Sequence, residues 1–111
     1  MISKAFFRAA DKLGLGRKEI EAILGLSQPT LSRMLKRKSP PPFGQKQEQL
    51  ALLCIRVYRS LGGLFGQDTE QIQAWFNAEN KALNGIPREL IKNIQGLVSV
   101  AEYLDAMRGK I

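Results

Sequence analysis

A run of hydrogen-bonding side chains between residues 27 and 38 has the composition of a surface that reads base edges. Its members are Ser27, Gln28, Thr30, Ser32, Arg33, Lys36, Arg37 and Lys38. In the major groove of DNA a glutamine amide can pair with adenine, an arginine guanidinium with guanine, and hydroxyl groups with base edges or phosphates. The closing run of cations is suited to phosphates, which position a protein without reading sequence. We therefore predict a DNA-reading surface, to which Arg17 and Lys18 add nearby cations.

Three short helices must position these side chains. Apolar residues recur at helical spacing over residues 4–15 and again over residues 17–24. Gly25 can adopt the positive φ angle of a tight turn, and Ser27 can cap a third helix that runs to about Lys38. Two helices joined by such a short turn predict a helix-turn-helix, with the polar run on the exposed face of its second helix.

The net charge of the chain is +7, and it is unevenly placed. Residues 1–46 contain ten Lys and Arg residues against three acidic ones, whereas residues 47–111 contain seven of each. Surplus lysines can simply keep a protein soluble, but solubility does not explain why the surplus falls in one half. The asymmetry indicates one region that contacts phosphates and another that contacts protein.

Several classes of function are disfavoured by composition. The chain has no histidine and one cysteine, Cys54, which lies within an apolar stripe and is expected in the core. These counts provide neither the commonest general base nor a cluster of metal ligands. We expect no enzyme activity, no metal and no cofactor. No apolar stretch is long enough to span a membrane and no secretory leader is recognisable, so a cytoplasmic location is expected.

The segment Ser39-Pro40-Pro41-Pro42 cannot continue a helix and marks the clearest boundary. We predict a DNA-binding region over residues 1–42 and a helical dimerisation and partner-binding domain over residues 43–111. An apolar stripe then follows at Leu50, Leu53, Cys54, Val57, Tyr58 and Leu61. Leu52 and Ile55 widen it, which predicts a helix covered on two sides, by its own core and by a second subunit.

Glycines and caps delimit the remaining helices. Gly62, Gly63 and Gly66 are predicted to end the long helix. Asp68 and Gln71 form a capping pair for a helix that carries Trp75 and Phe76, which are assigned to the core or to a dimer interface. Asn84-Gly85 predicts a turn, Pro87 suits the first turn of a short helix over residues 88–94, and Gly96 is expected to end it. Ser99 and Glu102 then form a capping box for a final helix, and the fold class is all-α.

The first half resembles the phage-repressor-like, Xre-type helix-turn-helix in the residues RKEIEAILGLSQPTLSRMLKRK. From residue 72 onward, the sequence resembles the toxin-binding domain of the Xre/MbcA/ParS antitoxins. The matching features are Trp75, Asn77, Ala82-Leu83 with Gly85, Pro87, Leu90-Ile91, Gly96-Leu97, and Val100 with Tyr103-Leu104.

This resemblance implies a bacterial type II antitoxin that dimerises, binds its own promoter as an autorepressor and neutralises a RES-domain toxin. Such toxins are described as consuming NAD, and the C-terminal region of the antitoxin covers the nucleotide pocket. The residues that would contact the toxin are Tyr103, Arg108, Gly109, Lys110 and Ile111. Two alternatives remain open: a dimeric Xre-type transcriptional repressor with no toxin partner, and an interaction module that has lost DNA binding.

Overall fold

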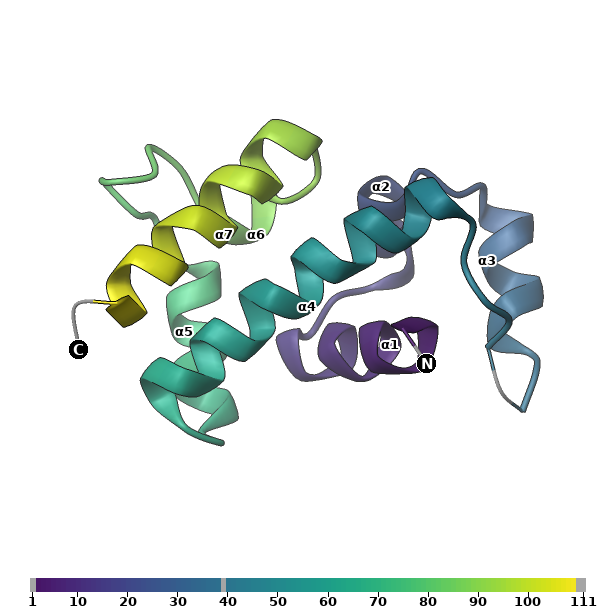
Figure 1. Cartoon of the computed structure of the whole chain (residues 1–111), viewed down its shortest axis with the longest axis horizontal. Coiled ribbons are helices and arrows are strands. Elements are labelled where there is room, and N and C mark those ends of the chain that lie inside the picture. Colours follow the sequence, from purple (N-terminus) through teal and green to yellow (C-terminus); the bar gives the residue numbers. More distant parts are fainter. Residues whose placement is uncertain (1, 39, 110–111) are drawn as a thin grey trace.

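A computed structural model describes residues 2–38 and 40–109 of the chain (Figure 1). Within these residues it contains seven helices and no strand. The helices are α1 (Ile2–Leu13), α2 (Arg17–Leu24), α3 (Gln28–Leu35), α4 (Gln45–Phe65), α5 (Thr69–Asn77), α6 (Pro87–Leu90) and α7 (Ile94–Gly109). The predicted all-α fold class, with a helix-turn-helix followed by a small helical domain, is confirmed. No helix in the described part of the chain is long and apolar enough to cross a membrane.

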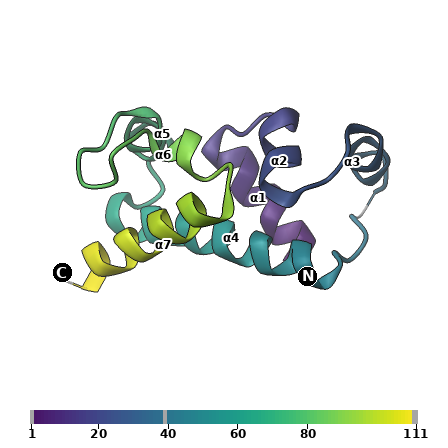
Figure 2. The same cartoon turned by 90° about the horizontal axis from the view of Figure 1, so that it is seen from above.

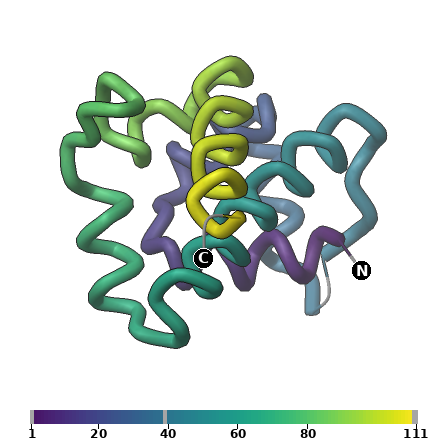
Figure 3. Tube along the Cα trace, turned by 60° about the vertical axis from the view of Figure 1, so that its left-hand side comes forward, coloured from purple at the N-terminus to yellow at the C-terminus, as the bar shows by residue number. Residues whose placement is uncertain are grey.

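Helix α4 is the central element of the fold. Helix α1 packs along its first half and α7 along its second, so that segments from both halves of the sequence contact one helix (Figures 1 and 2). In Figure 3, α7 lies in front of α4 with α5 to one side. A single cluster of buried side chains extends from Phe6 in α1 to Phe76 in α5 and Leu104 in α7. Cys54 is fully buried in this cluster, as predicted, and burial raises the pKa of its thiol to about 12.

Local sequence signals explain the helix boundaries of the first half. Helix α1 is followed by Gly14, which has a positive φ of 76°, and α2 by Gly25, which has a φ of 66°. Ser27 caps α3, because its hydroxyl oxygen accepts a hydrogen bond from the backbone N–H of Thr30 at 3.3 Å. The one departure is the end of α3, which lies at Leu35 instead of near Lys38.

The glycine pair in α4 does not end the helix. Helix α4 continues through Gly62 and Gly63 to Phe65 and ends at Gly66, whose φ is 68°. The side chain of Arg108 in α7 lies over Gly63, where an added Cβ atom would come within 2.9 Å of the guanidinium Nε. Packing against α7 therefore uses the space left by glycine, and this tertiary contact outweighs the modest helix-breaking tendency of the pair.

The boundary between α6 and α7 was also predicted wrongly, because α6 ends at Leu90 and Ile94 already belongs to α7. The helix begins at Ile94, so that Gly96 and the expected capping residue Ser99 lie inside it. The cap is Asn93, whose side-chain oxygen accepts a hydrogen bond from the backbone N–H of Gly96 at 2.8 Å. A Cβ atom at Gly96 would overlap the backbone carbonyl of Leu90. This glycine thus permits close contact between α7 and the preceding turn, where the sequence pattern had indicated a helix end.

The segment between α5 and α6 forms a turn as predicted. Asn84 adopts a positive φ of 58°, which asparagine tolerates better than most residues. The backbone groups of Asn80 and Gly85 pair with each other, at 2.8 Å in one direction and 3.2 Å in the other. Asp68 caps α5 by accepting a hydrogen bond from the N–H of Gln71 at 3.1 Å, which confirms that predicted pair.

Candidate nucleic-acid interface and the contact between the two halves

Helix α3 lies at one end of the molecule, and its main contact is with α2 (Figures 1 and 2). Leu31 points into the core and is 1% exposed. Around it, the sequence-predicted side chains remain at the surface. Ser27, Gln28, Arg33, Lys36, Arg37 and Lys38 are exposed, and Thr30 and Ser32 are partly buried. The polar face of α3 therefore points away from the hydrophobic core.

Short-range hydrogen bonds organise the exposed face of α3. Thr30 Oγ1 accepts hydrogen bonds from the Ser27 hydroxyl at 2.8 Å and from Arg33 Nη2 at 3.4 Å. Gln28 Nε2 donates to Ser32 Oγ at 3.3 Å. These bonds join residues within one helical turn and are open to solvent, so a base edge can replace them at little net cost. The face thus presents donors and acceptors of the kinds that can pair with base edges in a major groove.

Arg17 and Lys18, the two other predicted DNA-contacting residues, are exposed at the start of α2. The same turn contains Glu19, whose carboxylate accepts a hydrogen bond from the backbone N–H of Gly16 at 2.9 Å. The N–H groups at this helix end and the cationic side chains both favour an anion nearby.

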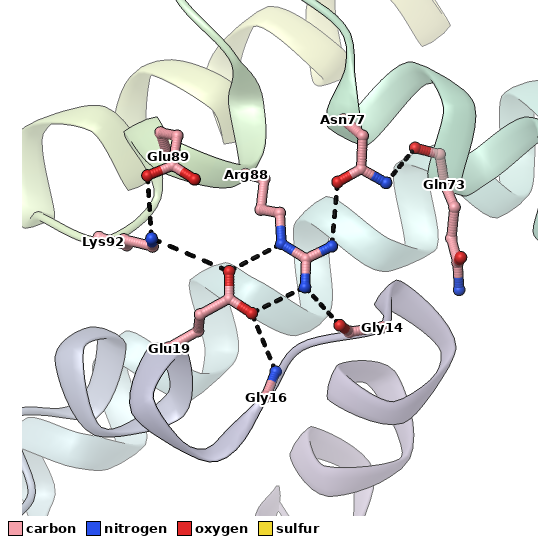
Figure 4. A network of polar contacts seen from close by, with 8 residues as sticks. All are labelled: Gly14, Gly16, Glu19, Gln73, Asn77, Arg88, Glu89 and Lys92. Carbon is pink, nitrogen blue, oxygen red and sulfur yellow. Dashed lines mark hydrogen bonds and ion pairs between the residues drawn. The ribbon is translucent and has the colours of Figure 1, made fainter.

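A polar network joins this end of α2 to the second half of the chain (Figure 4). The Arg88 guanidinium donates hydrogen bonds to both carboxylate oxygens of Glu19, each at 2.7 Å. It also donates to the backbone carbonyl of Gly14 and to Asn77 Oδ1 at 2.9 Å. Lys92 lies 3.9 Å from the same carboxylate. One arginine therefore connects α1, α2, α5 and α6.

Electrostatics explain why Glu19 remains ionised in this network. The hydrogen bond from Arg88 lowers the pKa of the Glu19 carboxyl below its ordinary value, and this effect exceeds the opposing effect of partial burial. Sequence reasoning missed both residues, because they are 69 positions apart and each looks like an ordinary surface charge. No local pattern pairs them.

The other predicted site residues divide between the core and the surface. Phe76 is fully buried and Ile55 is 7% exposed, so both belong to the core, whereas Leu52 is 46% exposed. Trp75 and Tyr103 are partly buried and stack on each other, with ring centroids 6.4 Å apart and an interplanar angle of 16°. This stack packs α7 against α5 near the C-terminal end of α7.

Arg108 and Gly109 are exposed at the end of α7, and Arg108 Nη1 donates a hydrogen bond to Ser60 Oγ at 3.4 Å. Lys110 and Ile111, which complete the predicted toxin-contacting set, lie outside the described residues. In Figure 1 this end of α7 and helix α3 are at opposite ends of the molecule. The two predicted binding surfaces are therefore well separated.

Two family models match the chain, and together they span almost all of it. Residues 3–56 match the antitoxin Xre-like helix-turn-helix domain. Residues 60–110 match the antitoxin Xre/MbcA/ParS C-terminal toxin-binding domain. The two matches adjoin within α4. None of the curated proteins compared with the chain matches it.

Proposed function

The chain belongs to the Xre/MbcA/ParS antitoxins and contains their helix-turn-helix DNA-binding domain, and on this premise we propose that it neutralises a RES-domain, NAD-consuming toxin by covering its active site. We further propose that it binds its own promoter as an autorepressor, acts as a homodimer in the bacterial cytoplasm and has no enzymatic activity. The observation that carries the proposal is the ordered match to both antitoxin domains in one chain.

Charge and exposure support the assignment of DNA binding and protein binding to different regions of the chain. Residues 1–42 would supply the DNA contacts through the exposed face of α3, and residues 43–111 the protein contacts. The surplus positive charge falls in the first 46 residues, and the exposed α3 side chains have base-reading chemistry. The end of α7 presents Arg108 and Gly109 to solvent, where a toxin can reach them.

Removal of residues 108–111 should abolish neutralisation of the toxin while leaving DNA binding intact. The reason is that the end of α7 lies far from α3, and that the deleted residues are the ones expected to enter the toxin pocket. Growth of cells that express a RES-domain toxin together with the full-length or the shortened chain measures the first effect. Co-purification, with the mass of the complex, measures binding and stoichiometry.

Gel-shift assays with the chain's own promoter provide the matched control for the deletion. Equal DNA affinity of the two chains would show that the shortened protein is folded. Full rescue of growth by the shortened chain would contradict the proposed cover of the active site.

Two substitutions should separate base reading from phosphate binding. Arg33→Ala should weaken binding to the operator by about 1 to 3 kcal/mol and relax specificity, because it removes a contact to a base edge. Lys38→Ala should weaken binding to all sequences alike and reduce the salt-dependence slope by about one, because it removes a phosphate contact. Titrations of operator and scrambled DNA at several salt concentrations measure both effects. Identical behaviour of the two variants would contradict the assignment.

A further inference from the structure

A shallow groove rich in arginine runs along the exposed side of α4, between α1 and the end of α7. It consists of two adjoining hollows of about 330 and 200 Å³, which share Ile55 and Arg59. The first also contains Leu52, Arg56 and Arg108, and the second contains Arg8. We call this surface the arginine groove. It lies apart from α3, which is at the far end of the molecule (Figure 1).

The positive charge of the arginine groove is only partly compensated. Arg56 forms an ion pair with Asp105, and Asp105 also accepts a hydrogen bond from Ser60 at 3.2 Å. Among the described residues, no carboxylate pairs with Arg59 or Arg8. Four arginines therefore line the groove, and one of them, Arg56, is paired with an aspartate. Their planar guanidinium groups are well suited to bidentate hydrogen bonds with carboxylates.

The floor of the arginine groove is apolar. Leu52 is 46% exposed although it is a large aliphatic residue in the middle of a helix. Ile55 lies beside it at the edge of the core. An exposed leucine in a hollow lined by Arg56, Arg59 and Arg108 has the composition of a protein interface, which combines an apolar contact with a polar rim.

Two other occupants fit the arginine groove less well. A second copy of the chain docked symmetrically on this face would bring two sets of four arginines together, and like charges across an interface are unfavourable. DNA would satisfy the arginines, but phosphates give no reason for an exposed leucine among them. A protein segment with carboxylates around an apolar side chain satisfies both parts of the groove.

We propose that the arginine groove is a docking surface for an acidic, apolar segment of the toxin. This inference rests on the proposed antitoxin function and adds a second contact to the one expected at the chain end. Arg108 belongs to both surfaces, since it lines the groove and lies in the segment predicted to contact the toxin pocket. The groove therefore continues the expected toxin-binding surface along α4.

Charge reversal at Arg59 tests the inference. Arg59 has no ion-pair partner among the described residues, and glutamate is as good a helix former, so Arg59→Glu should fold normally. It should raise the Kd for the purified RES-domain toxin that the proposed function requires by roughly 10- to 100-fold, with a weaker effect for Arg59→Gln. Titration calorimetry measures the Kd, and thermal unfolding checks the fold.

Lys46→Glu is the matched control. Lys46 is an exposed residue of the same helix, 13 positions earlier and thus roughly 20 Å away along the axis. This variant makes the same change in net charge outside the groove, and a negative charge is well tolerated in the first turn of a helix. Its Kd for the toxin should stay within about twofold of the wild-type value, because only general electrostatic attraction is altered.

The outcomes distinguish the groove from the proposed function. Failure of the wild-type chain to bind the RES-domain protein would overturn the proposed function and this inference together. Equal toxin binding by the wild-type chain and Arg59→Glu would overturn the groove alone. A loss of operator affinity in Arg59→Glu greater than that in Lys46→Glu would identify DNA as the occupant. A difference in oligomeric mass between the wild-type chain and Arg59→Glu, each measured without toxin, would identify a second copy of the chain as the occupant of the groove.

Discussion

Replacement of Gly96 by alanine should lower the free energy of unfolding by about 3 kcal/mol, because the added methyl group has no space at the junction of α6 and α7. The atom it would overlap is the backbone carbonyl oxygen of Leu90, which cannot move aside by a side-chain rotation. Relief requires the first turn of α7 to shift away from Leu90. That shift would disturb the packing of Leu97, which is 1% exposed in the core. Urea denaturation followed by circular dichroism measures the effect.

Gly62→Ala is the control for this prediction. Gly62 also lies inside a helix, but a Cβ atom there meets nothing within 4 Å. Alanine should therefore stabilise the chain by about 0.5 to 1 kcal/mol, since it reduces the entropy of the unfolded state and is the better helix former. Equal effects of the two substitutions would show that α7 does not approach Leu90 closely.

Arg88→Ala should destabilise the chain by about 2 to 3 kcal/mol at neutral pH. The substitution leaves the Glu19 carboxylate, whose side chain is 17% exposed, with the backbone N–H of Gly16 and the more distant ammonium of Lys92 as its remaining partners. Loss of one partner of a fully buried pair costs about 3 to 5 kcal/mol and of an exposed pair at most about 1, and this pair lies between the two. The substitution also removes the hydrogen bonds to the Gly14 carbonyl and to Asn77.

The effect of Arg88→Ala should depend on pH. Because the folded state lowers the pKa of Glu19, its contribution to stability is complete above the ordinary glutamate pKa of about 4.3. That contribution is lost as the pH falls through the lower pKa of the folded state. Urea midpoints of wild type and variant should therefore differ most at pH 6 to 7 and converge under strongly acidic conditions.

Lys92→Ala provides the comparison for Arg88→Ala. Lys92 lies 3.9 Å from Glu19 and pairs mainly with Glu89 at 2.9 Å, so its loss should cost at most about 1 kcal/mol. If Lys92→Ala and Arg88→Ala were equally destabilising, the bidentate geometry of Arg88 would have no special role.

The first half of the fold was predictable because its signals are local. Helices α1 and α2 are each followed by a glycine with positive φ, and α3 is preceded by the Ser27 cap. These signals delimit helices whose apolar residues are regularly spaced. The second half was harder because its glycines serve packing. Gly63 lies beneath Arg108 and Gly96 lies against Leu90, and sequence patterns do not distinguish such contacts from helix ends.

The candidate site was predictable to a similar extent. Exposure of Gln28 and Arg33 follows from the spacing of Leu31 and the other apolar residues of α3, so the polar face could be assigned from one helix alone. The Glu19–Arg88 pair and the arginine groove each combine residues from segments that the sequence separates widely. The pair depends on how α2 and α6 are placed, and the groove on how α1, α4 and α7 pack together, neither of which periodicity encodes.

The continuity of α4 has a consequence for turnover of the chain. This helix of 21 residues, roughly 32 Å long, is the surface on which both α1 and α7 pack. Opening of α4 exposes apolar surface of both halves at once, so neither half remains as an independent folded fragment. A protease that cuts the opened helix would end the proposed operator binding and the proposed toxin neutralisation in a single event. Both proposed functions therefore last only as long as α4 stays intact.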